Sequence, residues 1–239
     1  MLLDDAAEVG VLRGAPATHP KYAGRRIFGS GINLTHLYYG KISLIEFMIE
    51  RELGAVSKMY RGHDTGDWRH TELETRREKP WIAAVDAFAV GGACQWLLVM
   101  DRVIAETGSY FNLPARKEGI IPGCANLRLP RLIGERAARQ AIFFNRAFAA
   151  DSADGRLLAD EVVPGDDIDA AIDASAHELT SAGTTSLVAN RKQLRVGKEP
   201  LDVFRRYMSN YSREQAYCLY SPALIDNLER NWDAKRRAL

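Results

Sequence analysis

Short apolar runs dominate the first half of the chain, and each of them predicts a strand. Trp81–Val85 lies between a proline and an aspartate, which is typical of a short buried strand with turn residues at its ends. Val9–Leu12 is a similar run near the start of the chain. Two more strands are expected at 103–105 and 110–111, around a turn at Gly108.

Apolar residues at helical spacing occupy much of the rest of the chain. Ser43 and Glu46 have the spacing of a capping box, which predicts a helix from Ser43 to about Tyr60. Further helices are expected at Gln95–Met100, Gly134–Asn145, Ser152–Leu158, Ile168–Leu179, Leu187–Val196 and from about Asp202 to Leu239. This order of elements predicts an α/β core over residues 1–150 and a helical C-terminal region over residues 151–239.

Three segments rich in glycine, proline or polar residues interrupt these elements. Arg13–Gly31 is expected to form a long surface loop, and Gly62–Lys79 a mobile excursion. Leu113–Leu129 carries two prolines and two glycines near its start, which predicts an irregular segment. Aromatic and apolar side chains recur at helical spacing from Leu201 to Gln215, and we interpret this stripe as packing.

Composition excludes several classes of function. With 32 basic and 31 acidic residues the formal charge is +1, so we expect no nucleic acid partner. No apolar run approaches the roughly 20 residues of a membrane span, and the acidic start lacks the features of a signal peptide. Cys94, Cys124 and Cys218 are odd in number and scattered, which favours free thiols in the cytoplasm.

Two glycine-bearing corners are the strongest candidates for chemistry. Gly91 and Gly92 stand where the predicted strand gives way to a helix, and glycine lets another molecule approach the backbone closely. The first amides of a helix lack internal partners, so such a corner is able to hold an oxyanion. Gly29–Leu34 forms a second place where backbone N–H groups are presented. Cys94 follows the first corner, where we expect a small buried thiol.

Three motifs in these corners and beyond them resemble one family. They are FGSGINL at 28–34, PWIAAVDAFAVGGACQ at 80–95 and GIIPG at 119–123. In this order they resemble the markers of the crotonase (enoyl-CoA hydratase/isomerase) superfamily. The resemblance implies a spiral ββα fold, a trimer or a dimer of trimers, and an acyl-CoA thioester as the ligand. The family's first N-terminal strand is expected to be missing from this chain.

The resemblance also assigns an oxyanion hole. It implies that the N–H groups of Ile32 and Gly92 hold the thioester oxygen, on which negative charge develops in an enolate. Preorganised donors of this kind are worth about 10²- to 10³-fold in rate in other enzymes. Two family positions differ here, because hydratases carry glutamates where this chain has Gln95 and Ala115. An amide and a methyl group transfer no protons, so ordinary hydration is not expected.

One branch of the superfamily resembles the chain in more detail. Cofactor-independent dioxygenases of arylacetyl-CoA thioesters, known from antibiotic biosynthesis, share runs similar to GKISLIEF, RELG, KPWIAAVD and PARKEGIIPG. This resemblance implies that a substrate such as 3,5-dihydroxyphenylacetyl-CoA loses an α-proton and that the carbanion reduces molecular oxygen directly. The resulting peroxide attacks the thioester and releases CoA and an aryl glyoxylate. No metal or other cofactor is implied.

Positions matched to this branch suggest further roles. Gln95 would lie beside the reacting acyl group, and Arg51 would orient the arene hydroxyls or a partner carboxylate. Ile32, Leu34 and Ile120 would line a dry pocket for oxygen, which is apolar. By sequence alone Arg51 stands between two glutamates on a helix and has the pattern of an ordinary surface ion pair. The five histidines show no metal-binding spacing.

Two alternative functions remain open at this stage. The first is a crotonase-type hydratase, isomerase or thioesterase that uses Glu118 or another base, although Glu118 is expected to be exposed to solvent. The second is a degenerate homologue that binds acyl-CoA without catalysis.

Overall fold

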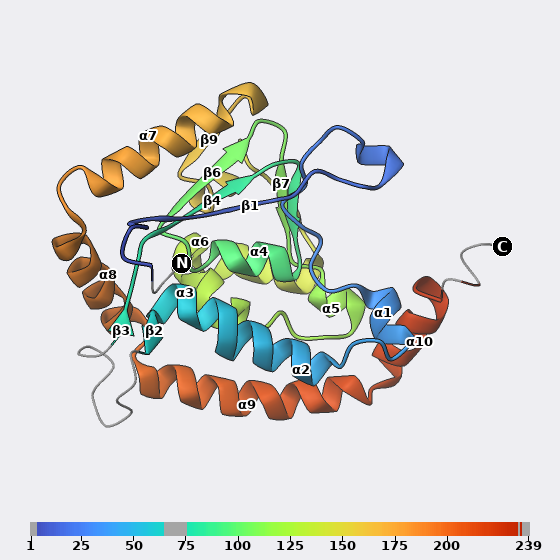
Figure 1. Ribbon diagram of the computed structural model, residues 1–239. Helices are drawn as coiled ribbons and strands as arrows, with labels where there is room; N and C mark the ends of the chain where they lie inside the picture. The colour runs from blue at the N-terminus through green and yellow to red at the C-terminus, as the bar shows by residue number, and fades with distance from the viewer. Residues whose placement is uncertain (1–3, 65–75, 234, 236–239) are drawn as a thin grey trace.

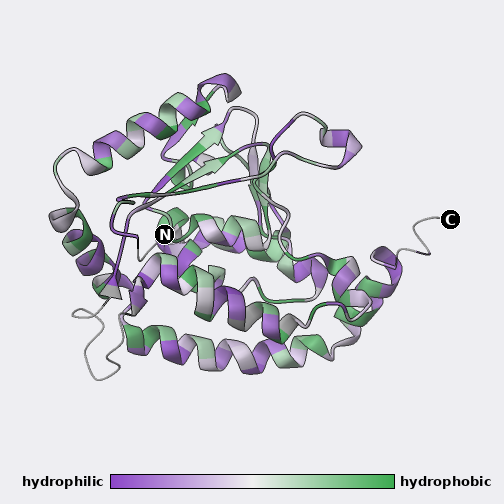
Figure 2. Ribbon diagram, viewed as in Figure 1, coloured by the Kyte–Doolittle hydropathy of each residue, from purple (hydrophilic) through white to green (hydrophobic). Residues whose placement is uncertain are grey.

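Four parallel strands form the main sheet in the computed structural model, which describes residues 4–64, 76–233 and 235 (Figure 1). They are β1 (Gly10–Arg13), β4 (Trp81–Val85), β6 (Arg102–Glu106) and β9 (Glu161–Val163), in the order β1-β4-β6-β9. Every residue of β4 is buried, because alternate side chains enter different apolar clusters. Figure 2 shows these strands as hydrophobic ribbons inside helices with mixed faces.

A second, smaller sheet stands beside the first and gives the fold its spiral. Its strands are β5 (Phe88–Val90), β7 (Tyr110–Asn112) and β8 (Phe148–Ala149). The chain turns from β4 into β5 at Ala87 (φ 57°), and from β6 into β7 through Gly108 (φ 82°). Each of these turns leads from the main sheet into the second sheet and then into helix, which confirms the predicted ββα architecture.

Helix α4 (Gly92–Leu97) follows β5, and helices α5 (Ala115–Glu118) and α6 (Ala125–Phe144) follow β7. Helix α1 (Leu34–Tyr38) lies earlier in the chain and packs against the C-terminal end of the molecule. The predicted helix after Ser43 is confirmed as α2 (Leu44–Met48), a π-helical stretch (Ile49–Val56) and α3 (Ser57–Arg61). Ser43 Oγ accepts a hydrogen bond from the N–H of Glu46 at 3.3 Å, as expected of an N-cap.

C-terminal helices pack around this core. They are α7 (Ile168–Thr180), α8 (Thr184–Lys198), α9 (Leu201–Leu219) and α10 (Pro222–Asn231). The single long tail helix that was predicted is broken, because Ser221 caps α10 and Pro222 occupies its first position. The predicted packing stripe is confirmed, since Phe204, Met208 and Tyr211 bury against Cys124. No helix of the described residues is long and apolar enough to cross a membrane.

Three other sequence predictions need correction or fall outside the described residues. The segment expected to be irregular up to Leu129 is helical from Ala125, because burial of residues such as Leu129 outweighs its poor helix pattern. Only a 3-10 turn forms within Ser152–Leu158, where the Ser152 hydroxyl bonds to local backbone instead. Most of the expected excursion, residues 65–75, lies outside the described residues, and its ends pair as β2 (His63–Asp64) and β3 (Arg76–Arg77).

Candidate functional site

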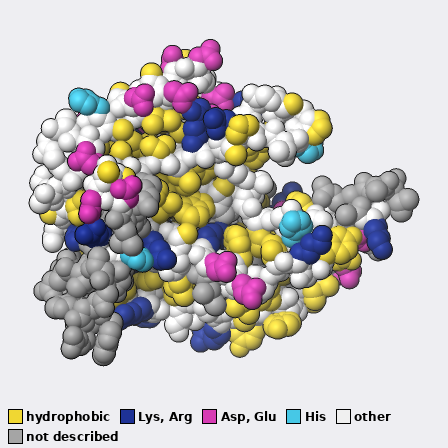
Figure 3. Space-filling model, in the orientation of Figure 1, with side chains coloured by type: hydrophobic (Ala, Val, Ile, Leu, Met, Phe, Trp, Pro, Cys, Tyr) yellow, Lys and Arg dark blue, Asp and Glu magenta, His cyan; other side chains and the backbone are white. Residues whose placement is uncertain are grey.

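All six residues predicted for the site line one cavity of about 450 Å³. They are Ile32, Leu34, Arg51, Gly92, Gln95 and Ile120. The cavity lies where the 28–34 loop, the start of α4, helix α5 and the C-terminal helices meet. Apolar side chains gather across the middle of the molecular face in Figure 3. What each lining residue does remains a prediction.

The two glycine-bearing corners, at Gly31 and at Gly92, are in close contact. A Cβ built on Gly31, whose φ is 83°, would lie 2.6 Å from the backbone nitrogen of Gly92. A Cβ on Gly92 would lie 3.4 Å from Gly31 Cα and 2.6 Å from Nη1 of Arg51. Among the described residues, no group accepts a hydrogen bond from the N–H of Ile32 or of Gly92. The N–H of Gly92 therefore lies against Gly31, the residue before Ile32, and the oxyanion role of both amides stays a prediction.

Backbone hydrogen bonds hold the first corner in place. The N–H of Gly29 donates to Phe88 at 3.2 Å, and the N–H of Val90 donates to Gly29 at 2.9 Å. Gly29 therefore extends the second sheet beside β5, as its bridge to Ala89 also shows. The N–H of Gly91 donates to Asn112 on β7 at 2.8 Å, which fixes the second corner to the same sheet.

A second cavity of about 490 Å³ adjoins the first at these glycines. The two cavities share Ser30, Gly31, Phe47, Arg51 and Gly92 in their linings. An elongated ligand that extends from one cavity to the other therefore passes the free amides. Such a division suits a molecule with a reacting group between two larger parts.

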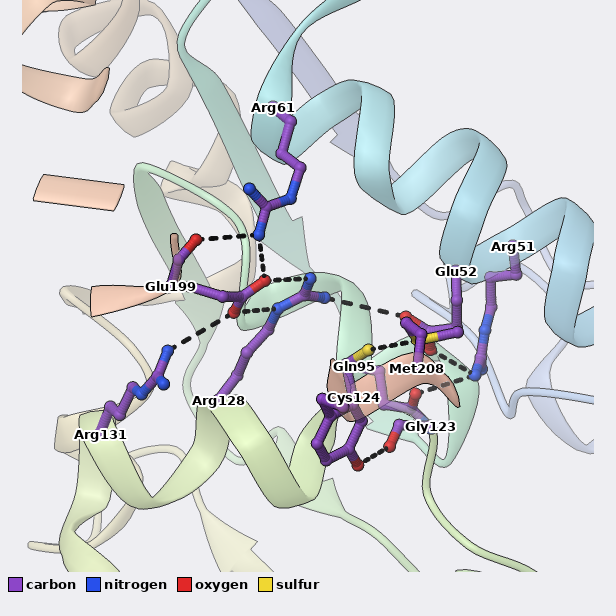
Figure 4. Close-up of polar contacts among 11 residues, drawn as sticks. Arg51, Glu52, Arg61, Gln95, Gly123, Cys124, Arg128, Arg131, Glu199 and Met208 are labelled. Atoms are coloured by element: carbon purple, nitrogen blue, oxygen red, sulfur yellow. Dashed lines mark hydrogen bonds and ion pairs between the residues drawn. The ribbon is translucent and has the colours of Figure 1, made fainter. Parts of the chain in front are cut away.

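Arg51 is buried, which corrects the expectation of a surface ion pair. Its side chain is 9% exposed, and its Nη2 donates to Glu52 at 2.7 Å and to Gln95 Oε1 at 2.9 Å (Figure 4). The guanidinium also lies 4.8 Å from the ring centroid of Phe47, which adds a cation–π contact. Both hydrogen bonds start at Nη2, whereas Nη1 donates to no described residue and would lie 2.6 Å from a Cβ on Gly92. Arg51 lines both cavities.

The π-helical stretch explains how two adjacent residues both point inward. Successive side chains of an α-helix diverge by about 100°, and the wider π-helical turn reduces this angle. Arg51 and Glu52 lie in this stretch and are both buried. Neither the π-helical turn nor the burial of Glu52 was predicted, because Arg128, which lies 3.8 Å from Glu52 Oε2, is distant in sequence. Local π-helical turns are frequent at functional sites.

Gly123 packs closely against the side chains of Arg51, Glu52 and Gln95. Its φ is 48°, and a Cβ there would lie 2.2 Å from Glu52 Oε1 and 2.3 Å from Gln95 Oε1. Its carbonyl accepts a hydrogen bond from the hydroxyl of Tyr207 at 2.6 Å. The last glycine of the GIIPG motif is therefore needed for close approach to the Arg51 cluster, a role that the motif alone did not indicate.

Glu118 is half-buried and lines the cavity, which corrects its expected exposure to solvent. Its Oε2 accepts hydrogen bonds from Asn227 at 2.8 Å and from the indole N–H of Trp232 at 3.1 Å. Sequence reasoning missed these partners and the contribution of Trp232 to the cavity wall. Asn227 lies in the last helix and Trp232 directly after it, and no local pattern connects them with residue 118.

The buried cysteines are structural. Cys94 is 1% exposed, and burial raises the pKa of its thiol to about 12. Burial likewise raises the pKa of Cys124. Both thiols therefore stay protonated near neutral pH, and the expected burial of Cys94 is confirmed. Within the described residues, no group of three or more histidine, cysteine, aspartate or glutamate side chains is placed to hold a metal ion.

Comparison with known proteins identifies the family. Residues 45–209 match the enoyl-CoA hydratase/isomerase family, and the chain belongs to this family, the crotonase superfamily. Solved structures share its fold at low sequence identity. An enoyl-CoA hydratase/isomerase from Xanthobacter autotrophicus has a TM-score of 0.73 at 22% identity, with 99% of this chain and 81% of that chain covered. An enoyl-CoA hydratase from Mycobacterium avium subsp. paratuberculosis has a TM-score of 0.74 at 19% identity, with 95% and 81% covered.

Among curated proteins, a more specific likeness appears. The (3,5-dihydroxyphenyl)acetyl-CoA 1,2-dioxygenase of Amycolatopsis orientalis is 48% identical over 225 residues, which cover 94% of this chain and 50% of that protein. The crotonyl-CoA hydratase of Syntrophomonas wolfei is 30% identical over 182 residues, which cover 75% of this chain and 61% of that protein. The chain therefore spans about half the length of the dioxygenase that it matches.

Proposed function

We propose that this chain catalyses the cofactor-independent dioxygenation of an arylacetyl-CoA thioester, with molecular oxygen as the co-substrate. The observation that carries the proposal is the pairing of free amides at Ile32 and Gly92 with neutral residues at Gln95 and Ala115. A site of this kind stabilises an enolate and offers no pair of carboxylates for adding water to a double bond. The 48% identity to a dioxygenase of (3,5-dihydroxyphenyl)acetyl-CoA supports this reaction and substrate.

The proposed chemistry begins at the thioester. Loss of one α-proton places negative charge on the thioester oxygen, where the N–H groups of Ile32 and Gly92 donate to it. The carbanion then transfers electrons to oxygen and forms a carbon–oxygen bond, which gives an α-peroxide. The peroxide attacks the thioester carbonyl and expels CoA as the thiolate. Cleavage of the O–O bond with loss of the second α-hydrogen leaves the aryl glyoxylate, so that each turnover consumes one O₂ and releases two protons.

Side chains around the corner have separate proposed roles. Gln95 and Arg51 lie beside the acyl group as a hydrogen-bonded pair, and Arg51 orients the hydroxyls of the arene. Ile32, Leu34 and Ile120 supply the apolar wall at which oxygen gathers, because a nonpolar gas partitions into an apolar cavity. We also propose a homotrimer or a dimer of trimers, which light scattering of the purified protein tests.

Oxygen uptake tests the proposal. Protein treated with a chelator is mixed with (3,5-dihydroxyphenyl)acetyl-CoA, and dissolved oxygen and released thiol are followed together. We expect one O₂ consumed for each CoA released, and incorporation of both atoms of ¹⁸O₂ into the glyoxylate. A folded protein that binds the thioester but consumes no oxygen would contradict the proposal.

A second candidate is isomerisation of an enoyl-CoA. It is favoured by Glu118, the one carboxylate among the described residues of the cavity lining, because moving a double bond needs one base rather than two. Enoyl-CoA substrates of several lengths, assayed without oxygen, separate it from the first candidate. Rearranged product in the absence of oxygen supports the isomerase.

A further inference from the structure

Glu118 is the one carboxylate in the lining of the 450 Å³ cavity, within the described part of the chain. Two other lining side chains are ionisable, and neither suits a proton acceptor. The guanidinium of Arg51 carries donors and no acceptor. Burial raises the pKa of Tyr211 well above its usual value, so its hydroxyl stays protonated. Gln95 is a neutral amide. By elimination, the cavity holds one group able to accept a proton from carbon.

Glu118 lies one helical turn after Ala115 and on the same side of α5. Both residues belong to α5 (Ala115–Glu118), and side chains three apart lie on the same side of a helix. Both also line the cavity. Ala115 occupies the position at which hydratases carry a glutamate, so the carboxylate stands one helical turn further along the same element.

Helix α10 fixes this carboxylate. Gly119 ends α5 with φ 83°, and a Cβ there would lie 2.8 Å from the Cα of Leu224 on α10. This close contact brings α10 against α5, where Asn227 and Trp232 both donate to Glu118 Oε2. Oε1 receives no hydrogen bond from any described residue. One oxygen of Glu118 is therefore anchored, while the other keeps its lone pairs free at the cavity wall.

We propose that Glu118 accepts the α-proton of the thioester substrate, and this role rests on the proposed function. The bond between the α-carbon and hydrogen breaks, the proton passes to Oε1, and the electron pair is delocalised onto the thioester oxygen at Ile32 and Gly92. Asn227 and Trp232 are positioning residues, because they act through Glu118 and hold its rotamer. The remaining steps need only O₂, which the proposed reaction already supplies.

Two rates measured on the full chain test this assignment. The first is exchange of the α-hydrogens of (3,5-dihydroxyphenyl)acetyl-CoA for deuterium in D₂O without oxygen, corrected for exchange without protein. The second is oxygen uptake with the ordinary and the α-dideuterated substrate. We expect Glu118→Gln to lower both rates by about 10²- to 10⁴-fold, with unchanged thioester affinity and a larger isotope effect on uptake.

Matched variants separate chemistry from packing. Glu118→Asp restores part of both rates, because a carboxylate returns to the cavity at a shorter reach. Trp232→Phe removes one N–H donor but keeps an aromatic side chain, and we expect a smaller loss that is confined to kcat. Lys117→Gln alters the exposed neighbour on the same helix and serves as a control with wild-type rates.

The outcomes distinguish the two proposals. If the wild type exchanges deuterium but consumes no oxygen, and Glu118→Gln does not exchange, Glu118 is the acceptor and the dioxygenase proposal is wrong. If Glu118→Gln keeps wild-type rates of exchange and of uptake, the assignment of Glu118 is wrong and dioxygenation stands. If the wild type neither exchanges deuterium nor consumes oxygen, both proposals are overturned.

Discussion

The cavity and the buried ion pairs beside it differ in how their charged side chains are paired. We use the term ion-pair cluster for Arg61, Arg128, Arg131 and Glu199, which meet at the fully buried Glu199. Within the cluster every charge faces an opposite charge, with Arg61 and Arg128 at 2.8 and 3.0 Å from Glu199 Oε1. Among the described residues that line the cavity, Arg51 and Glu118 alone carry charge, and no described residue donates a hydrogen bond to Oε1 of Glu118.

Glu52 connects these two regions. Its Oε1 accepts from Arg51 at the cavity wall, and its Oε2 lies 3.8 Å from Nη1 of Arg128 in the cluster (Figure 4). Each buried guanidinium of the cluster thus faces a carboxylate, Glu199 or Glu52, rather than the cavity. The comparison teaches that the site depends on a few unpaired donors, which act strongly on a developing charge because little else competes with them.

Removal of the central charge of the cluster should have the largest effect. Glu199→Gln leaves buried guanidinium groups without their counter-charge, and breaking a buried ion pair in this way costs about 3–5 kcal/mol. The measurement is urea-induced unfolding, followed by circular dichroism. Glu135→Gln is the matched control, because its pair with Arg139 is exposed and contributes at most about 0.5 kcal/mol. Equal stability of the two variants would contradict the account.

Closing the oxyanion corner should damage catalysis more than stability. Gly31→Ala forces a Cβ toward the nitrogen of Gly92, so kcat/KM should fall by about 10²- to 10³-fold. Gly40→Ala is the control, because Gly40 also has a positive φ of 65° but no atom within 4 Å of the added Cβ. It should lose roughly 1 kcal/mol of stability from backbone strain and keep its activity. Equal activity of both variants would contradict the assignment of an oxyanion hole to this corner.

Protonation of Glu199 in acid should lower the free energy of unfolding by less than the Glu199→Gln substitution does. Burial alone would raise the pKa of Glu199, but hydrogen bonds and charges from Arg128 and Arg61 outweigh it and lower the pKa below 4.5. A carboxyl whose pKa is lower in the native state than in the unfolded state stabilises the protein at pH values above the unfolded-state pKa. This stabilisation is lost as the pH falls through the native-state pKa. The free energy of unfolding should therefore decline below about pH 4.5, and the decline should be weaker in Glu199→Gln. Parallel pH profiles in both proteins would contradict this assignment.

The smallest effect is expected at the oxygen wall. Ile120→Val removes one methyl group from a half-buried side chain, and a fully buried methylene contributes about 0.8 kcal/mol. We therefore expect the KM for oxygen to rise roughly twofold, with the KM for the thioester unchanged. Ile45→Val on an exposed helix face is the control. A change confined to the thioester would assign Ile120 to the acyl pocket instead.

Local patterns predicted the parts of the molecule that depend on neighbours in sequence. Strand β4 has the same bounds as the predicted apolar run, Trp81–Val85. Ser43 caps the helix that was predicted to begin there. Both features follow from side chains a few residues apart. The residues found in the lining of one cavity were assigned by the family resemblance and not by a local pattern.

Contacts between distant segments were beyond this kind of prediction. Arg51 is buried by Gln95, 44 residues away, and Glu118 is held by Asn227, 109 residues away. No periodicity or motif connects such pairs. The start of α6 was missed for the same reason, because the burial of Leu129 becomes visible only when the packed helices are known.

The vibration of the thioester carbonyl tests the central claim most directly. A ¹³C=O-labelled arylacetyl-CoA is bound to the protein without oxygen, and the carbonyl stretch is read from an infrared difference spectrum. If the amides of Ile32 and Gly92 both donate to this oxygen, the stretch moves to lower wavenumber on binding and returns toward its solution value in Gly31→Ala. An unshifted carbonyl in the bound wild-type complex would contradict the account.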